Sequence, residues 1–250
     1  MNTQATLERM RQLKLQGMAT HWETLLRLPV NQWPPTDHLL ASLLDAEHEY
    51  RQERKTRTAI TQARFRYQAS LEEVIYTPDR QLDKSMVLRL GDLSFVRRGE
   101  NILITGATGC GKSYLATCLG YQACQRGLRV GYFSMPKLME RLHLARADGS
   151  YTRELARLER LQLLILDDWG LSSLDMNAKL ALLQLIEDRH GRSATIITSQ
   201  LPVSKWYEYL AEPTLADAIL DRLVHQAHRI ELQGESMRRR IKKTNDLTGS

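Results

Sequence analysis

The first part of the chain carries its apolar residues at the spacing of helices. From Thr6 to Leu28 they recur at three- and four-residue steps, the period of one helical face, and prolines follow directly. A second helical run begins near Asp37, which we expect to be its N-cap. The apolar stripe of this second run consists of Leu39, Leu40, Leu43, Leu44 and Tyr50. We therefore predict a small all-helical domain over residues 1–65.

After Gly91 the pattern changes to short apolar runs that alternate with segments of helix length. The runs resemble buried strands and cover residues 101–105, 129–134, 161–167, 193–199 and 228–232. Helical periodicity occupies the segments between them, residues 113–126, 136–147, 176–190 and 213–227. This repeated strand–helix–strand order predicts a parallel sheet with right-handed crossovers and helices on both faces. We assign residues 66–250 to this α/β domain.

The composition is that of a globular protein and excludes several other classes. Apolar residues make up 42% of the 250 residues and charged residues 26%, which is ordinary for a soluble domain. No basic start followed by an apolar leader is seen, and no run of about 18 apolar residues occurs. We therefore expect a cytoplasmic protein with no membrane partner. Cys110, Cys118 and Cys124 lack paired spacing, which argues against a disulfide framework or a zinc site.

The stretch GATGCGKS, residues 106–113, lies between the first predicted strand of the α/β domain and its helix. It fits the pattern G-x-x-x-x-G-K-[ST], whose glycines let backbone N–H groups approach phosphate oxygens. The helix directs its positive end at the same point, Lys112 reaches the terminal phosphates, and the Ser113 hydroxyl can coordinate Mg²⁺. The predicted nucleotide-binding residues are Gly106, Ala107, Thr108, Gly109, Cys110, Gly111, Lys112, Ser113 and Tyr114.

Two acidic residues end the apolar run 163–166. Asp167 and Asp168 would therefore lie at the carboxyl edge of a parallel sheet, where ligands collect. We expect Asp167 to hold Mg²⁺ together with Ser113, and Asp168 to polarise the attacking water. The 55 positions from Lys112 to Asp167 leave room for one extra strand and its helix, as in phosphate-loop ATPases with an additional strand.

A formal net charge of +6 favours a polyanionic partner, because a basic side chain placed against a phosphate releases a counterion. One candidate DNA contact is a basic stretch near the domain junction, in which Phe65 and Tyr67 are interleaved. Its basic residues are Arg51, Arg54, Lys55, Arg57, Arg64 and Arg66. A second candidate is the set Lys137, Arg141 and Arg146, and a third is the run 238–243. Solvated helix faces and a solubilising tail are the alternatives.

These motifs resemble those of the AAA+ ATPases, and within them the group of IstB-like transposition helper ATPases and DnaC-like helicase loaders. The resemblance covers about residues 65–245. It is carried by GATGCGKS (106–113), LLILDDWG (163–170), TIITSQLP (195–202), DAILDRL (217–223) and GESMRR (234–239). TSQLPVSKWYEYL and GESMRR are similar to IstB proteins of insertion sequences in particular. The resemblance implies a five-stranded parallel sheet in the order 5-1-4-3-2.

The resemblance also implies roles for polar residues outside the two phosphate motifs. Ser199 or Gln200 is similar to the first sensor, with the register between them open. Arg222 is similar to the arginine finger that reaches the γ-phosphate bound by a neighbouring subunit, and Arg238 to the second sensor. AAA+ proteins usually carry glutamate where this chain has Asp168, which is shorter by one methylene, or about 1.5 Å of reach. This departure favours slow hydrolysis.

The function implied is that of a DNA-binding ATPase with ATP and Mg²⁺ as cofactors. By resemblance it forms a homo-oligomer on duplex DNA, hydrolyses ATP slowly until assembled, and assists the transposase of the same mobile element in target capture. A replicative helicase loader is the nearest alternative. A small-molecule kinase is an alternative from another class. Against it stand the two adjacent aspartates, the placements of Arg222 and Arg238, and the absence of an obvious lid segment. A scaffold that only binds nucleotide is a third.

Overall fold

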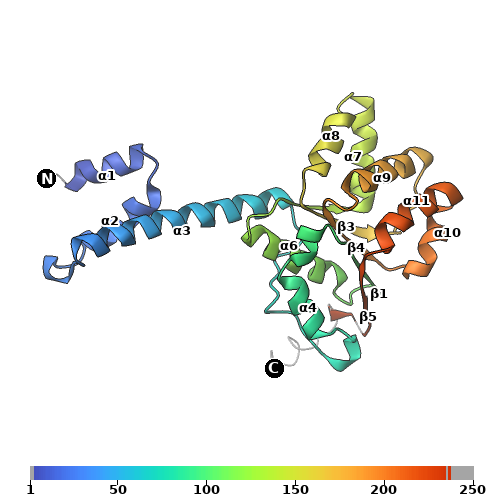
Figure 1. The fold of residues 1–250 in the computed structure, drawn as a ribbon, viewed down its shortest axis with the longest axis horizontal. Helices are drawn as coiled ribbons and strands as arrows, with labels where there is room; N and C mark the ends of the chain where they lie inside the picture. The colour runs from blue at the N-terminus through green and yellow to red at the C-terminus, as the bar shows by residue number, and fades with distance from the viewer. Residues whose placement is uncertain (1–2, 235, 238–250) are drawn as a thin grey trace, which may run out of the picture. The chain divides into compact units, whose positions relative to one another are not determined.

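The protein is described by a computed structural model, which covers residues 3–234 and 236–237 (Figure 1). The chain divides into two compact units, Met1–Thr58 and Ala59–Ser250. The domain boundary predicted after residue 65 falls a few residues inside the second unit.

The first unit is helical, but its helices differ from the predicted runs. The run expected over residues 6–28 is two helices, α1 (Thr3–Gln12) and α2 (Gln16–Leu26), separated at Lys14, whose φ of 60° is left-handed. After the short helix η1 (Val30–Gln32), α3 (Thr36–Ala63) begins one residue before Asp37. Asp37 therefore lies in the first turn and is not the N-cap.

Only part of the apolar stripe predicted for α3 is buried. Leu43 is buried, whereas Leu40, Leu44 and Tyr50 are exposed. Periodicity alone therefore predicted the helix but overestimated how much of its apolar face is covered.

The close approach of α2 to α3 depends on Gly17. A Cβ at this position would lie 2.3 Å from the carbonyl oxygen of Ala46. The buried carboxylate of Glu47 accepts hydrogen bonds from the backbone N–H groups of Gly17 at 2.8 Å and Met18 at 3.3 Å. These N–H groups have no partner within their own helix at its first turn, so Glu47 satisfies them.

The second unit contains the predicted five-stranded parallel sheet. Its strands are β1 (Ile102–Gly106), β2 (Val130–Ser134), β3 (Leu163–Trp169), β4 (Ala194–Ser199) and β5 (His228–Leu232). Their order is β2-β3-β4-β1-β5, with every pair parallel. Read from the other edge this is the predicted order 5-1-4-3-2, which is confirmed. The carboxyl ends of β1, β4 and β3 are therefore neighbours.

Helices cover both faces of the sheet, as predicted (Figure 1). One face carries α4 (Lys84–Gly91), α5 (Ser94–Arg98) and α6 (Lys112–Gln125), which follow the short helix η2 (Pro78–Arg80). The other face carries α7 (Met135–Ala147), α8 (Tyr151–Glu159), α9 (Met176–Arg189), α10 (Trp206–Leu210) and α11 (Pro213–Val224). The helix η3 (Val203–Lys205) leads into α10. The sequence pattern missed α4, α5, α8 and α10, because helices of five to nine residues hold few periods.

Strand side chains alternate between the two cores. Ile102 and Ile104 pack on the α6 face, and Leu103 packs on the α9 face. This alternation follows from the two-residue period of a strand. Because both faces are buried, the strands read as continuous apolar runs in the sequence.

Among the described residues no helix combines the length and apolar character needed to cross a membrane. Cys110, Cys118 and Cys124 are buried free thiols. Burial raises the pKa of Cys118 and of Cys124 to about 12, so both stay protonated and unreactive near neutral pH.

Candidate nucleotide-binding site

The loop between β1 and α6 has the backbone of a phosphate cradle. Gly106 ends β1 with φ 143°, and a Cβ there would lie 2.2 Å from the carbonyl oxygen of Leu232 on β5. Gly111 is the N-cap of α6 with φ 98°. Both positions exclude other residues, by contact or by conformation. The first turn of α6 therefore presents its N-terminal N–H groups at the carboxyl edge of the sheet.

Lys112 is the buried cation of this loop. Its Nζ donates to the carbonyl oxygens of Gly106 at 2.7 Å and Ala107 at 2.8 Å. Burial lowers the pKa of Lys112, and the carboxylates of Asp167 and Asp168 partly offset this effect. The ammonium is thus held by two loop carbonyls, which phosphate oxygens can replace as acceptors.

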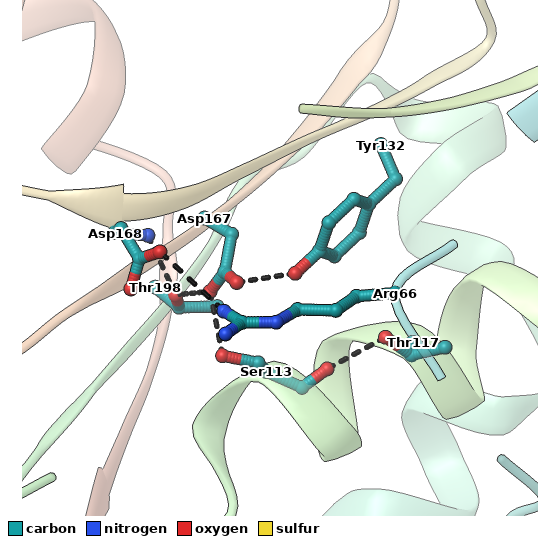
Figure 2. A network of polar contacts seen from close by, with 7 residues as sticks. All are labelled: Arg66, Ser113, Thr117, Tyr132, Asp167, Asp168 and Thr198. Carbon is teal, nitrogen blue, oxygen red and sulfur yellow. Dashed lines mark hydrogen bonds and ion pairs between the residues drawn. The ribbon is translucent and has the colours of Figure 1, made fainter. Parts of the chain in front are cut away.

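The side chains of Asp167 and Asp168 both lie at the carboxyl edge of the sheet because β3 is irregular there. Successive side chains of a regular strand point to opposite faces. The register of β3 against β4 shifts between Leu166 and Trp169, and Asp168 has a left-handed φ of 63°. Such a conformation is strained for a residue other than glycine, and bulges of this kind redirect side chains beside sites. As a result the two carboxylates lie near one another (Figure 2).

Three hydroxyl groups from three elements converge on Asp167 (Figure 2). Ser113 Oγ of α6 donates to Oδ1 at 2.7 Å, Thr198 of β4 donates to the same oxygen, and Tyr132 of β2 donates to Oδ2. Asp167 is fully buried. Burial, followed by the charge of Asp167, raises the pKa of Tyr132, so its hydroxyl remains a donor. The carboxylate is thereby fixed in position and direction.

The pair Ser113 and Asp167 fits the ligand chemistry of Mg²⁺. Hydroxyl and carboxylate oxygens are its preferred protein ligands, and Mg²⁺ usually takes its remaining ligands from water and phosphate. The 2.7 Å contact brings the two predicted ligands together. Thr198 and Tyr132 would orient the carboxylate from behind, as partners of ligating groups commonly do.

Asp168 faces a cation of its own chain. Arg66 Nη1 lies 3.8 Å from Asp168 Oδ2, and the backbone N–H of Asp168 donates to Thr198 Oγ1 at 3.3 Å. Arg66 was predicted to join a DNA-binding stretch together with Phe65. The Phe65 ring instead packs on Tyr121 at 4.7 Å between centroids, against the buried core. Phe65 therefore packs in the core of the second unit, and Arg66 lies beside Asp168.

Two cavities meet at Lys112. The larger, of about 390 Å³, is lined by Tyr67, Glu73, Ile75, Arg80, Gly109, Gly111, Lys112, Ser113, Tyr114 and Met237. The Tyr114 hydroxyl donates to Glu73 at 2.9 Å in its wall. The smaller, of about 140 Å³, is lined by Lys112, Asp168, Trp169, Gly170, Leu171, Thr198, Ser199, Gln200 and Leu201. The larger cavity is therefore lined by the phosphate loop and the start of α6, and the smaller by the carboxyl ends of β3 and β4.

The geometry distinguishes the two candidates for the first sensor. Ser199 Oγ is buried, donates to Trp169 O at 2.8 Å and accepts from Leu201 N at 3.0 Å. Gln200 is exposed, and its Oε1 accepts from Thr108 Oγ1 of the phosphate loop at 2.8 Å. The hydroxyl of Ser199 therefore forms hydrogen bonds only to backbone atoms of Trp169 and Leu201, whereas the side chain of Gln200 contacts the phosphate loop.

Arg222 lies away from the nucleotide site of its own chain. Its Nη2 is 2.8 Å from Glu187 Oε1 of α9, and Nη1 donates to Ala218 O at 2.8 Å. The backbone oxygen of Arg222 accepts from Asn101 Nδ2 at 3.2 Å. Since Asn101 precedes β1, the end of α11 that carries Arg222 lies at the amino edge of the sheet, opposite the phosphate loop. Arg238 lies outside the described residues.

The remaining DNA candidates lie on two helices. Arg54, Lys55 and Arg57 are on α3 and exposed, and Arg57 pairs with Glu53 at 2.6 Å. On α7, Arg141 pairs with Glu154 at 2.8 Å. Arg146 stacks over the ring of Tyr151 at 4.3 Å, while Lys137 is exposed.

Sequence reasoning did not assign Tyr132, Thr198, Arg66 or Arg80 to this site. The polar Thr198 at the end of an apolar strand is a signal that could have been used. Tyr132 and the two arginines carry no local signal, because their roles arise from contacts with residues 30 or more positions away in the chain.

Comparisons with known proteins agree with these features. Residues 8–245 match the model of a family described as IstB-like ATP binding protein. A protein of Sinorhizobium fredii, named for ATP binding in an insertion sequence, is 44% identical over 94% of this chain and 96% of its own. A protein of the insertion sequence IS21 of Pseudomonas aeruginosa, also named for ATP binding, is 30% identical over 92% of this chain and 87% of its own.

Solved structures share the fold over most of the chain. The crystal structure of DnaI superposes with a TM-score of 0.58 at 21% identity, over 71% of this chain and 94% of that one. DnaA from Aquifex aeolicus, solved with AMPPCP, gives 0.58 at 19% identity over 73% and 55%. The fold is therefore that of the AAA+ proteins.

Proposed function

The chain belongs to the family of IstB-like ATP binding proteins, and we propose that it is an ATPase that assists a transposase during insertion-sequence transposition. It binds MgATP, assembles into a homo-oligomer on duplex DNA, and helps the transposase capture its target. The observation that carries the proposal is the convergence of Lys112, Ser113 and Asp167 at the carboxyl edge of β1 and β3.

Nucleotide binding follows from the exchange of partners at Lys112. Its ammonium leaves the carbonyls of Gly106 and Ala107 and pairs with the β- and γ-phosphates. Ser113 and Asp167 would hold Mg²⁺, which would supply positive charge beside the phosphates. The nucleoside occupies the larger cavity beside Ile75 and Tyr114.

Hydrolysis takes place at the smaller cavity. Asp168 polarises a water whose oxygen attacks the γ-phosphorus, while the bond from that phosphorus to the β–γ bridging oxygen breaks to release ADP and phosphate. Gln200, which lines the cavity and contacts Thr108, orients the γ-phosphate as the first sensor. The short side chain of Asp168 and its pairing with Arg66 at 3.8 Å both favour a slow step.

Assembly of the oligomer brings an arginine, Arg222, to the nucleotide site of the neighbouring subunit. Arg222 lies at the sheet edge opposite its own phosphate loop, so it can complete only a neighbour's site. An arginine donated in trans stabilises charge on the transferring phosphoryl group only when the neighbour is docked. Turnover therefore depends on oligomerisation. Arg238 serves as the second sensor of its own chain.

Contacts to duplex DNA come from exposed basic side chains. Arg54 and Lys55 on α3 and Lys137 on α7 are exposed candidates. Arg57 is exposed as well but is paired with Glu53 at 2.6 Å. Arg141 and Arg146 are already engaged by Glu154 and Tyr151 and would have to exchange these partners. The net charge of +6 favours the same class of ligand.

The test is ATPase rate per subunit against protein concentration, with and without duplex DNA. The expected result is a rate that rises with concentration and with DNA, and that is lost in Lys112→Ala. Arg222→Ala should bind MgATP normally yet lose the rise. A rate per subunit that ignores both concentration and DNA, or an Arg222→Ala protein with unaltered turnover, contradicts the proposed assembly.

A pull-down experiment separates this function from that of a helicase loader. The tagged chain is mixed with the transposase of the same element or with a replicative hexameric helicase, in the presence of MgATP. Retention of the transposase alone supports the proposal, and retention of the helicase alone overturns it.

A further inference from the structure

Arg80 is a buried arginine at the nucleotide site that contacts neither Lys112 nor the two aspartates in any hydrogen bond or ion pair among the described residues. It ends the short helix η2 and lines the larger cavity. Only 6% of its surface is exposed. A charged side chain is seldom buried to this extent unless its charge is paired or used.

The guanidinium joins two segments that wall the cavity. Nη1 donates to the carbonyl oxygen of Ile75 at 2.6 Å, and Nη2 donates to that of Cys110 in the phosphate loop at 2.7 Å. The backbone oxygen of Arg80 accepts from Gln233 N at 3.2 Å, just beyond β5. One residue therefore connects the segment before η2, the loop and the end of the sheet's edge strand.

The contact with Cys110 sets the direction of a donor in the cradle. Because the peptide between Cys110 and Gly111 is planar and trans, its N–H points opposite to its carbonyl. Fixing the Cys110 carbonyl on Arg80 therefore fixes where the Gly111 N–H points. The guanidinium also lies directly against Gly111, since a Cβ at that position would be 2.7 Å from Nη2.

The positive charge of Arg80 has no carboxylate partner among the described residues, where both of its hydrogen-bond acceptors are neutral carbonyls. Its Nε is buried and has no acceptor among these residues. An arrangement of this kind costs stability compared with an apolar side chain of similar size. A polyphosphate bound in the adjacent loop supplies the compensating charge.

We propose that Arg80 is a positioning residue for the nucleotide: it holds the phosphate loop in its binding shape and places a positive charge behind the phosphates. This inference rests on the proposed binding of MgATP and deepens it. Because Arg80 lines the larger cavity and not the smaller one, where the γ-phosphate is attacked, we expect it to act mainly on KM and little on kcat.

The experiment compares Arg80→Met and Arg80→Lys with the wild type and with Arg189→Met as a matched control. Arg189 is also a buried arginine that donates to backbone carbonyls, those of Leu158, Leu161 and Ala194, but it does not line either cavity. Binding of MgATP and MgADP is measured by calorimetry, and turnover by phosphate release. The thermal midpoint without nucleotide reports folding.

For Arg80→Met we expect Kd for both nucleotides and KM for ATP to rise roughly 10- to 30-fold, about 1.4 kcal/mol per tenfold, with kcat within threefold. Arg80→Lys keeps the charge but replaces the planar fork of donors with one compact ammonium, so its Kd should lie between those of the wild type and Arg80→Met. Arg189→Met should lose thermal stability and keep wild-type Kd. If Arg80→Met does not fold, Arg80→Lys is compared with Arg189→Lys by the same measurements.

Three results overturn the inference. They are an Arg80→Met protein whose Kd stays within twofold of wild type, an Arg80→Lys protein as weak as Arg80→Met, and an Arg189 variant that binds equally poorly. Wild-type protein with no affinity for MgATP overturns instead the proposed function itself, so the two failures are distinguishable.

Discussion

The two edges of the parallel sheet bury polar groups in different ways. At the amino edge, the Arg189 guanidinium donates to three backbone carbonyls at 2.6–2.9 Å and to Thr195. At the carboxyl edge, Lys112 donates to two loop carbonyls, and Asp167 accepts from three hydroxyls. Both edges hide charge from water.

What differs is whether the partners can be exchanged. The carbonyls around Arg189 end helices and begin strands, so losing the arginine leaves them buried and unpaired. The partners of Lys112 are carbonyls of a glycine-rich loop, which phosphate oxygens can replace as acceptors. The partners of Asp167 are side-chain hydroxyls, and Mg²⁺ can take their place at the carboxylate. Burial of a polar group therefore does not identify a functional site by itself. A functional site is indicated when the partners of the buried group can be replaced by a ligand.

The largest expected effect is that of Asp167→Asn at the carboxyl edge. The amide keeps the size of the carboxylate but removes its charge, and the NH₂ group cannot accept from the hydroxyls around it. We expect kcat for ATP to fall by on the order of 10²- to 10³-fold. Phosphate release at saturating MgATP measures the effect. A loss smaller than tenfold would mean that Asp167 does not serve the metal.

Next comes Arg189→Met at the amino edge, where the loss should be in stability alone. Three carbonyls lose a charged donor, which costs about 3 kcal/mol. The thermal midpoint without nucleotide should fall by roughly 6–12 °C, as followed by circular dichroism. If the folded Arg189→Met variant bound MgATP with a higher Kd than wild type, the amino edge would also affect nucleotide binding, and the proposed difference between the two edges would be wrong.

A smaller effect is expected for Arg66→Ala. Arg66 is half-exposed, and its 3.8 Å pairing with Asp168 withdraws that carboxylate from the water it would polarise. Turnover of the nucleotide-saturated protein should rise about two- to threefold, since an ion pair at this exposure is worth less than about 1 kcal/mol. Arg64→Ala, two residues earlier, serves as the control. A fall in turnover would instead make Arg66 a group that assists hydrolysis.

The smallest effect is a pH dependence at the amino edge. Hydrogen bonds from Arg98 and then His228 lower the pKa of Glu100 to about 2, from a usual 4.5. A lowered carboxylate pKa stabilises the fold above about pH 4.5, and this stability is lost as the pH falls toward 2.

Glu100→Gln should therefore lower the thermal midpoint slightly at pH 7, by less than the equivalent of about 1 kcal/mol. The difference from wild type should shrink as the pH falls from about 4.5 and disappear only below about pH 2, the pKa of Glu100 in the folded protein. If the difference in thermal midpoint between wild type and Glu100→Gln stayed constant with pH, it would arise from packing and not from the charge of Glu100.

The first unit contained the clearest wrong predictions from the sequence. The break at Lys14 and the exposure of Leu40 and Leu44 do not follow from periodicity. A helical stripe predicts which residues share a face, but not whether another element covers that face. In the second unit both sheet faces are covered, so apolar runs and observed strands agree to within two residues at each end.

The local chemistry of the site could be predicted from eight consecutive residues. Glycines at fixed intervals, followed by Lys112 and Ser113, determine a phosphate loop wherever a strand precedes and a helix follows. The alternation of strands and helices likewise determined the sheet, since parallel strands need crossovers. Both are properties of near neighbours in the chain.

Only the tertiary structure decided how the remaining polar groups meet. The bulge at Asp168 turns two successive carboxylates to one edge. At the end of β4, by contrast, the successive residues Ser199 and Gln200 reach different partners, Trp169 O and Thr108 Oγ1. Arg80 reaches the loop across 30 positions of sequence. A shift of one residue in a strand reverses the direction of a side chain, so register and long-range contact, which no local pattern encodes, settle these roles.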